Sequence, residues 1–242
     1  MKGFISALQF ITILPFGRPG TFAPSAMLRF FPLAGLLLGG LLAVFDCLAG
    51  LIWPRQMVSV LDMVFMVWIT GAFHADGLGD TADGLYGNRP REKALEIMKD
   101  SRIGAMALVT VFCTLTVKWS AIAGLDSHRS LFLLIIPAYA RGGMLFGFRF
   151  LPYGRPGGGT GHALFAEKIK WAEFSGLLIP FFLSLFCGWR GLLLNLVFVC
   201  IVAALLCFYQ KRMGCITGDM LGAMTEITEA ALFLAVAAGG RI

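Results

Sequence analysis

The chain has 242 residues, of which 58% are hydrophobic and only 14% charged, and its net charge is +6. Soluble domains contain about 45–50% apolar and about 25% charged residues, so a water-soluble fold of this size could not bury so much apolar surface. The composition excludes an ordinary soluble enzyme and predicts an integral membrane protein with a single domain, residues 1–242. The basic residues are scattered between apolar segments, which favours membrane lipid over nucleic acid as a partner.

The cysteines and the N-terminus carry no sign of export. None of the six cysteines forms a C-x-x-C pair, and five of them lie in apolar segments. A free thiol in such a place behaves as a small hydrophobe, so neither a disulfide framework nor a zinc site is expected. Phe4–Leu14 is a short apolar stretch with no cleavage site behind it, so no cleavable signal peptide is expected.

Seven apolar stretches approach the length of about 20 residues that a membrane span requires. In chain order they are Phe30–Trp53, Val58–His74, Ile103–Leu125, Leu131–Phe150, Phe174–Cys187, Gly191–Tyr209 and Leu221–Gly239. The fifth is short and a tight turn follows it, so it could form a hairpin with the sixth and reduce the count to six. The sequence therefore predicts an all-α, polytopic transmembrane helical bundle of about seven segments.

The basic residues also predict the orientation of the bundle. With a cytoplasmic N-terminus, the inner loops hold fourteen of the twenty Lys and Arg residues and the outer loops hold four. This asymmetry follows the positive-inside rule. The same orientation places the polar stretches 1–29, 75–102, 151–173 and 210–220 on one face. We therefore expect a multi-pass protein of the cytoplasmic (inner) membrane with its active site facing the cytoplasm.

The first polar motif, His74–Gly87, carries aspartates spaced i, i+4 and i+7 at positions 76, 80 and 83. At about 100° per residue, a helix would hold these carboxylates within a sector of about 60°. Neighbouring carboxylates repel one another unless a cation lies between them, and their oxygens suit Mg²⁺ or Mn²⁺. Asp76, Asp80 and Asp83 are therefore predicted metal ligands. The plainer alternative is a solvated turn rich in Asp and Gly.

The second motif, Arg91–Gly104, begins as an amphipathic helix that is expected to lie on the membrane surface. It ends in a dense charged cluster directly before a predicted span. There Asp100 could complete the metal site, while Lys99 and Arg102 contact phosphate groups. An ordinary basic anchor beside the membrane would explain the same residues without any site.

The third motif, Gly214–Glu229, opens the last span and carries Asp219 and Glu226 on one helix face. Glu226 and Glu229 fall one to two turns inside the span, where a carboxylate is costly unless it has a partner. Asp219 is a further predicted metal ligand, and Glu226 is a predicted catalytic residue. A structural ion pair, for example with Arg141, is the competing interpretation.

The fourth motif, Leu151–Gly161, contains three consecutive glycines and Arg155. Glycine N–H groups can cradle a phosphate, and an arginine can bind one through two parallel hydrogen bonds. Arg155, together with Arg141 one span earlier, is therefore a predicted phosphate ligand. A glycine-rich loop of this kind is more often only a flexible connection.

These motifs together resemble a known family over nearly the whole chain. The matching segments are Leu8–Pro15, Phe31–Gly35, His74–Gly84, Leu95–Gly104, Arg141, Tyr153–Arg155 and Thr217–Ala223. Their residues and their order resemble the cobalamin synthases, which are adenosylcobinamide-GDP ribazoletransferases. Cys215 departs from the glycine that the pattern leads us to expect, and 157–159 is unusually rich in glycine. Neither departure touches an acidic residue.

The resemblance implies a bacterial or archaeal inner-membrane enzyme of late cobalamin biosynthesis. It would transfer the adenosylcobinamide phosphate moiety of adenosylcobinamide-GDP to α-ribazole, or to its 5′-phosphate, and release GMP with Mg²⁺ as cofactor. Asp83 or Glu226 would accept the proton of the ribazole hydroxyl, and Lys99 would act with Arg102 and Arg155 on the phosphates. A homo-oligomer, or association with other late cobalamin enzymes, is compatible with this role.

Two other functions fit parts of the sequence. The order Asp80-x-x-Asp83-Gly84 also opens the motif of the CDP-alcohol phosphotransferases, although the rest of that motif is missing. A phospholipid synthase of that type is therefore the nearest rival. A membrane transporter would also carry intramembrane charges and glycine-interrupted segments. Against it, the acidic residues cluster at one interface and no inverted repeat is visible.

Overall fold

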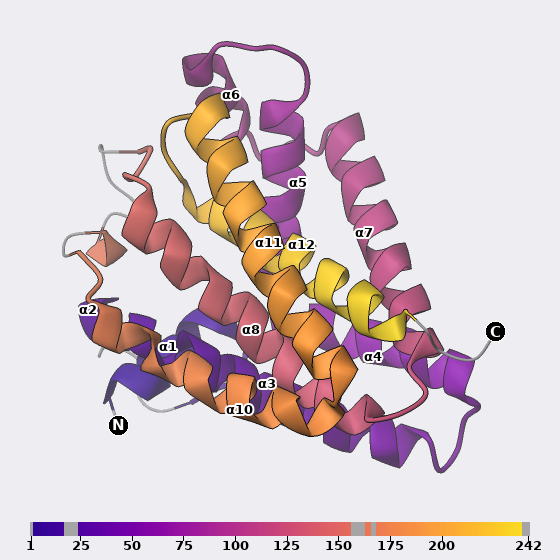
Figure 1. Cartoon of the computed structure of the whole chain (residues 1–242). Coiled ribbons are helices and arrows are strands. Elements are labelled where there is room, and N and C mark those ends of the chain that lie inside the picture. Colours follow the sequence, from indigo (N-terminus) through magenta and orange to yellow (C-terminus); the bar gives the residue numbers. More distant parts are fainter. Residues whose placement is uncertain (1, 17–23, 156–162, 166–167, 239–242) are drawn as a thin grey trace.

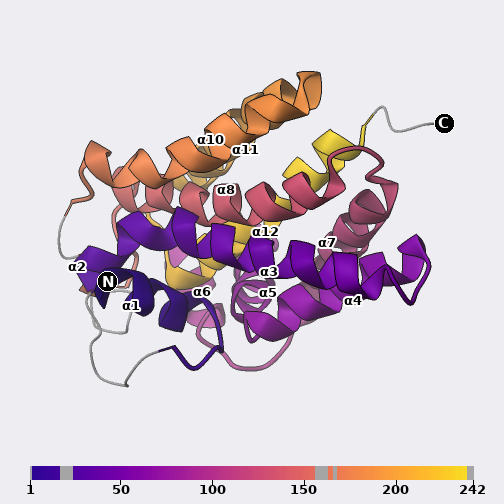
Figure 2. The ribbon, with the colours of Figure 1, turned by 90° about the horizontal axis from the view of Figure 1, so that it is seen from below.

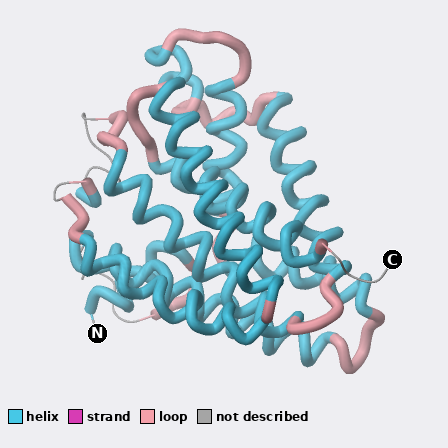
Figure 3. The backbone as a smooth tube through the Cα atoms, viewed as in Figure 1, coloured by secondary structure: helices cyan, strands magenta, loops and turns pink. Residues whose placement is uncertain are grey.

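The fold is a bundle of helices in this computed structural model, which describes residues 2–16, 24–155, 163–165 and 168–238 (Figures 1 and 3). No β-strand occurs in those ranges, and a single isolated bridge pairs Tyr153 with Ile216. The expected all-α class is confirmed. The glycine run at 157–159 lies outside the described residues.

The helices follow one another with short connections. The first half of the chain contains α1 (Lys2–Ile11), α2 (Pro24–Met27), the 3₁₀ turn η1 (Leu28–Phe30), α3 (Phe31–Ala49), α4 (Arg55–Ile69), α5 (Phe73–Leu85) and α6 (Arg91–Ile97). The second half contains α7 (Ala105–Gly124), α8 (Arg129–Phe150), η2 (Trp171–Leu177), α10 (Leu178–Ser184), η3 (Leu185–Cys187), α11 (Trp189–Arg212) and α12 (Gly218–Ala237). The amphipathic helix expected after the first motif is α6.

Within the described ranges, five helical segments are long and apolar enough to cross a membrane, so the chain is a multi-pass membrane protein. They are Leu28–Ala49, α7, α8, α11 and α12, and the bent pair α4–α5 would be a sixth. All seven predicted stretches are helical, but the fifth lies in Trp171–Cys187, which is too short to count as a span. The structure therefore gives five or six spans and one shorter apolar segment, close to the alternative count of six.

The break between α4 and α5 determines where the first motif lies. Gly71 and Ala72 both have positive φ, 59° and 57°, and the two helix axes meet at 86°. A glycine reaches this backbone region at little cost, whereas a residue with a Cβ does so rarely. The aspartates therefore stand on a helix of their own, and not on the continuation of the preceding span.

Close backbone contacts position the central helices. α8 is the most buried span and packs along α3, beside which it runs when the bundle is seen from below (Figure 2). A Cβ at Gly39 would collide with the Leu134 carbonyl, so α3 approaches α8 only because it is glycine. Gly77 of α5 meets the Asp219 backbone of α12 in the same way, with only 2.8 Å from a Cβ at Gly77 to the Asp219 carbonyl oxygen. The first and third motifs are thereby brought face to face.

Candidate active site

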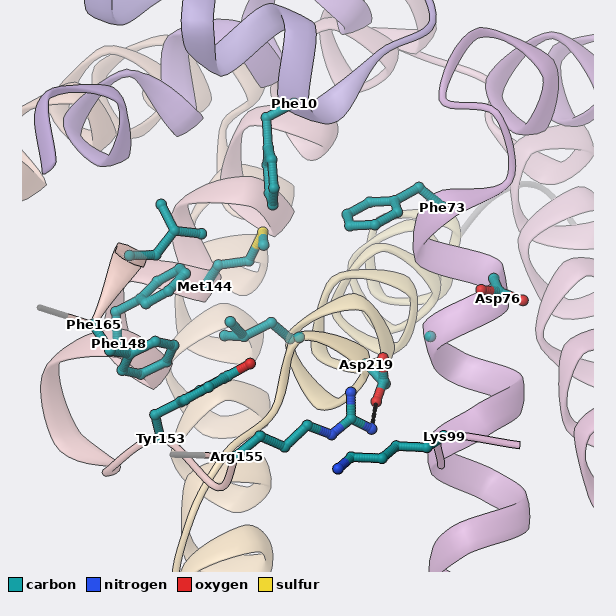
Figure 4. A pocket seen from close by; sticks show the side chains of 14 residues that line it. Phe10, Phe73, Asp76, Lys99, Met144, Phe148, Tyr153, Arg155, Phe165 and Asp219 are labelled. Atoms are coloured by element: carbon teal, nitrogen blue, oxygen red, sulfur yellow. Dashed lines mark hydrogen bonds and ion pairs between the residues drawn. The ribbon is translucent and has the colours of Figure 1, made fainter. Parts of the chain in front are cut away.

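A cavity of about 330 Å³ lies where α5, α8 and α12 meet (Figure 4). Its polar lining includes Asp76, Lys99, Tyr153, Arg155 and Asp219, so four sequence motifs contribute to one space. These motifs are far apart in the sequence, and the fold brings them together.

The other wall of the cavity is aromatic. Phe10 and Phe73 pack edge to face with ring centroids 5.4 Å apart, and Tyr153 stacks on Phe165 at 4.9 Å. Phe148 adds a further ring to the lining. Figure 4 shows Phe10 and Phe73 on one side of the cavity and the Arg155 and Lys99 side chains on the other. The cavity therefore suits a ligand with both an apolar ring surface and an anionic group.

Asp76, Asp80 and Asp219 form the acidic cluster of this site. Asp76 and Asp80 are one helical turn apart on α5, and Asp219, in the first turn of α12, lies against the neighbouring Gly77. Asp76 and Asp219 line the cavity, and Asp80 lies behind its wall. The Asp80 carboxylate lies within electrostatic range of both the others and of Arg155. Three carboxylates and one fixed cation leave an excess of two negative charges.

Arg155 holds the acidic cluster to two neighbouring segments. Its Nη2 donates to Asp219 Oδ2 at 2.6 Å and to the Met98 carbonyl at 3.2 Å. The turn that carries Arg155 is fixed in turn by Gly154 N–H, which donates to the Ile216 carbonyl at 2.8 Å. Thr217 caps α12 by accepting the Met220 N–H. The guanidinium is therefore held in a fixed position at the cavity wall.

The excess charge of the acidic cluster matches one divalent cation, and carboxylate oxygens suit Mg²⁺. Within the part of the chain that the structure describes, no three His, Cys, Asp or Glu side chains are gathered tightly enough to coordinate an ion. The carboxylate oxygens therefore fit Mg²⁺ in chemistry, and Asp76, Asp80 and Asp219 are the residues that would hold it.

Asp83 has a different environment from the other aspartates of its motif. Its Oδ2 accepts the Gly104 N–H at 2.7 Å and its Oδ1 accepts the Ala107 N–H at 3.0 Å. These are the first free amides of α7, so the carboxylate caps that helix from a neighbouring one. Asp83 does not line the cavity. The structure places this predicted ligand and base in a helix-capping position.

Asp100 and Arg102 pair with each other on the surface. Arg102 Nε and Nη2 donate to the Asp100 carboxylate at 3.0 and 2.5 Å, and these hydrogen bonds lower the pKa of Asp100 to about 2. Both residues line a separate polar pocket together with Asp83. Lys99 alone of the charged 99–102 cluster lines the cavity.

Glu226 and Arg141 belong to a buried ion network inside the bundle. Lys118 Nζ of α7 donates to Glu226 Oε2 at 2.9 Å and to Glu229 Oε2 at 2.5 Å, and Arg141 of α8 pairs with Glu229. All four side chains are buried and lie outside the cavity lining. The structural ion pair with Arg141, the competing interpretation of the third motif, is therefore made by Glu229. Glu226 pairs with Lys118 instead.

The sequence motifs do not predict two features of this region. Lys118 lies in the middle of a span, where a lone lysine indicates a buried partner but not which one. The aromatic wall comes from α1, the start of α5 and the end of α8, whose rings look like ordinary membrane-facing residues in the sequence. Nearby His74 is fully buried, and neither ring nitrogen has a hydrogen-bond partner within the described part of the chain.

Comparison with known proteins identifies the family. A family model described as cobalamin-5-phosphate synthase matches residues 3–237. The chain belongs to the cobalamin-5-phosphate synthase family.

Relatives align over nearly their full length. A protein of Pseudomonas syringae named adenosylcobinamide-GDP ribazoletransferase is 37% identical, over 98% of this chain and 99% of its own. Proteins with the same name are 38% identical in Pseudomonas putida, over 99% and 100% of the two chains, and 36% identical in Alkaliphilus metalliredigens, over 97% and 94%. No solved structure matches. The part of the chain that matches the cobalamin-5-phosphate synthase model includes every residue of the cavity lining.

Proposed function

We propose that this chain is an adenosylcobinamide-GDP ribazoletransferase, as its relatives are named. The observation that carries the proposal is the cavity itself, which combines an aromatic wall, two cationic side chains and an acidic cluster with unbalanced charge. A nucleotide diphosphate joined to a large ring system needs those three features together. The phospholipid synthase and the transporter remain the rivals that an assay must exclude.

Three groups of residues would have separate roles in the transfer. Arg155 and Lys99 contact the diphosphate oxygens, where charged hydrogen bonds are strongest. Asp76, Asp80 and Asp219 would hold Mg²⁺, which when bound neutralises the charge of the diphosphate and of the departing GMP. The aromatic wall of Phe10 and Phe148 packs against the apolar surface of a substrate and excludes water.

The transfer replaces one phosphate–oxygen bond by another. The ribazole hydroxyl oxygen bonds to the phosphorus on the cobinamide side, the bond from that phosphorus to the bridging oxygen breaks, and GMP leaves. The hydroxyl proton needs a carboxylate within hydrogen-bond reach. Asp83 and Glu226 are occupied by the α7 amides and by Lys118. Asp76 and Asp80, which have no such partners among the described residues, are the candidate bases.

The active site faces the cytoplasm in this proposal, with the chain in the cytoplasmic membrane. The basic loops that support this orientation include the segments carrying Lys99 and Arg155, which are the residues assigned to phosphate. A nucleotide substrate made in the cytoplasm would reach the cavity without crossing the bilayer.

The test is an assay of the purified full chain with adenosylcobinamide-GDP and α-ribazole, with and without Mg²⁺, in which GMP release is measured. We expect GMP in equal amount to the new cobalamin, and none when Mg²⁺ is chelated. Parallel reactions with α-ribazole 5′-phosphate decide which acceptor is preferred. Product from CDP-diacylglycerol and an alcohol, or tracer flux across proteoliposomes without GMP, would overturn the proposal in favour of a rival.

A further inference from the structure

A second, polar pocket lies at the C-terminal end of α5, between α5, α6 and the start of α7. It measures about 600 Å³, and its lining includes Arg89, Arg102, Asp83 and Asp100. The two carboxylates are already occupied, because Asp83 accepts the α7 amides and Asp100 accepts Arg102. Arg89 has no carboxylate partner among the described residues. The pocket therefore offers a free cation to an anionic group.

An apolar groove continues from this pocket. The groove measures about 300 Å³, and its walls include Leu78 of α5, Leu205 and Phe208 of α11 and Ala223 of α12. Tyr86 and Met106 line both the groove and the polar pocket. The two spaces thus adjoin and form one amphipathic site with a charged end and an apolar end.

The groove opens where the protein meets the hydrocarbon of the bilayer. Its lining comes from α5, α7, α11 and α12, and both α7 and α11 pack on α12. Their outer faces expose large apolar side chains, such as Leu108 (62% exposed) and Phe112 on α7 and Val199 on α11. In a membrane those faces contact acyl chains, so an open groove between them is filled by one.

Two observations point to an anionic head group. Arg212 Nη2 donates to the Gly87 carbonyl at 2.7 Å, which holds its guanidinium beside the turn that leads to Arg89. Neither Arg212 nor the adjacent Lys211 has a carboxylate partner in the described part of the chain. In addition, the buried Thr81 hydroxyl lines the groove and has no hydrogen-bond partner among the residues that the structure describes, so it can donate to an ester oxygen of a ligand.

We propose that this site binds an anionic phospholipid. The phosphate lies at Arg89 and Arg212, and one acyl chain lies in the groove between α7 and α11. The site is separate from the cavity, because neither the polar pocket nor the groove shares a lining residue with it, and the groove follows the face of α5 that carries Leu78, Thr81 and Leu85.

The test is lipid binding to the full chain after removal of lipid in detergent. Phosphatidylglycerol and phosphatidylcholine with the same acyl chains are titrated in, and bound adducts are counted by native mass spectrometry. We expect one tight phosphatidylglycerol adduct, with at least about tenfold weaker binding of phosphatidylcholine, because both lipids carry the phosphate but Arg89 and Arg212 repel the cationic choline group. Equal binding of the two lipids would overturn the proposal.

Matched variants locate the adduct. Thr110→Trp fills the groove from α7, and Leu108→Trp places the same ring on the exposed face of that helix. Arg89→Ala removes the head-group cation, and Lys93→Ala removes an exposed lysine of α6. We expect the Thr110 and Arg89 variants to weaken the tight adduct by about tenfold or more and the two controls to leave it unchanged. A uniform response of all four variants would contradict the site.

A competition arm separates lipid from a soluble phosphate ligand. Inorganic phosphate and α-ribazole 5′-phosphate are added to the lipid-bound protein at millimolar concentration. Retention of phosphatidylglycerol supports the proposal, since neither competitor supplies an acyl chain for the groove. Displacement by α-ribazole 5′-phosphate would assign the pocket to a soluble ligand and overturn the proposal. This result is independent of whether the chain is a ribazoletransferase.

Discussion

The buried ion network and the acidic cluster both take carboxylates from α12, but they differ in charge balance. In the network, Lys118 and Arg141 neutralise Glu226 and Glu229, and all four are buried. In the acidic cluster, one arginine faces three carboxylates beside an open cavity. Carboxylates in a membrane bundle therefore indicate a binding or catalytic site only where cations do not neutralise all of them and a ligand can reach them.

Breaking the network should have the largest effect on stability. Lys118→Met leaves Glu226 buried without a partner, and removal of one member of a buried pair costs about 3–5 kcal/mol. We expect a loss of folded protein in detergent, measured as a fall in melting temperature by at least several degrees.

A compensating variant tests whether charge balance is the cause. Lys118→Met with Glu226→Gln keeps the Arg141–Glu229 pair and removes the charges of Lys118 and Glu226 together. It should recover much of the lost melting temperature and retain transferase turnover. A double variant that folds normally but has no turnover would instead make Glu226 catalytic.

The acidic cluster should show the opposite behaviour, with activity lost and the fold retained. Asp80→Asn preserves side-chain shape but removes a charge from the cluster, and loss of one such electrostatic contribution costs about 10²–10³ in turnover. GMP release at saturating Mg²⁺ measures this, and the melting temperature should stay within a few degrees of wild type. Wild-type turnover at saturating Mg²⁺ would rule out the metal site.

The sequence predicted the position of the acidic cluster better than it predicted the role of each aspartate. Helical spacing placed Asp76 and Asp80 on one face, and the structure has both on α5, close to Asp219 of α12. The same spacing grouped Asp83 with them, because helical periodicity predicts the direction in which a side chain points but not the group that it contacts there. Only the tertiary fold brings the first amides of α7 to that carboxylate.

The aromatic wall and the bend before α5 were beyond the reach of sequence for a related reason. A phenylalanine in a membrane protein can face lipid, the core or a cavity, and Phe10 and Phe148 carry no mark of which. The break at Gly71 and Ala72 lies within an apolar run that reads as a continuous span. The overall class was predictable because composition alone determines the solvent.

Asp83 belongs neither to the buried ion network nor to the cavity lining. Its replacement should lower the melting temperature by an intermediate amount. Asp83→Ala frees two amides at the start of α7, and a lost helix cap costs about 1 kcal/mol. Asp83→Asn keeps one acceptor oxygen and should cost less. Melting temperatures of the two variants should therefore fall in the order wild type, Asn, Ala. Loss of turnover in Asp83→Asn with an unchanged melting temperature would return Asp83 to the catalytic group.

The smallest effect is expected at Asp100, whose carboxylate is solvent-exposed and paired with Arg102. Arg102 lowers the pKa of Asp100 from an ordinary value of about 3.9 to about 2. A lowered carboxyl pKa favours the folded state above the ordinary value, and that contribution is lost as the pH falls toward 2. Because solvent screens this exposed pair, Asp100→Asn should lower the melting temperature only slightly at pH 7, and that small difference from wild type should disappear as the pH falls from 4 toward 2. Activity that falls with Asp100→Asn as steeply as with Asp80→Asn would show that Asp100 moves into the acidic cluster when substrate binds.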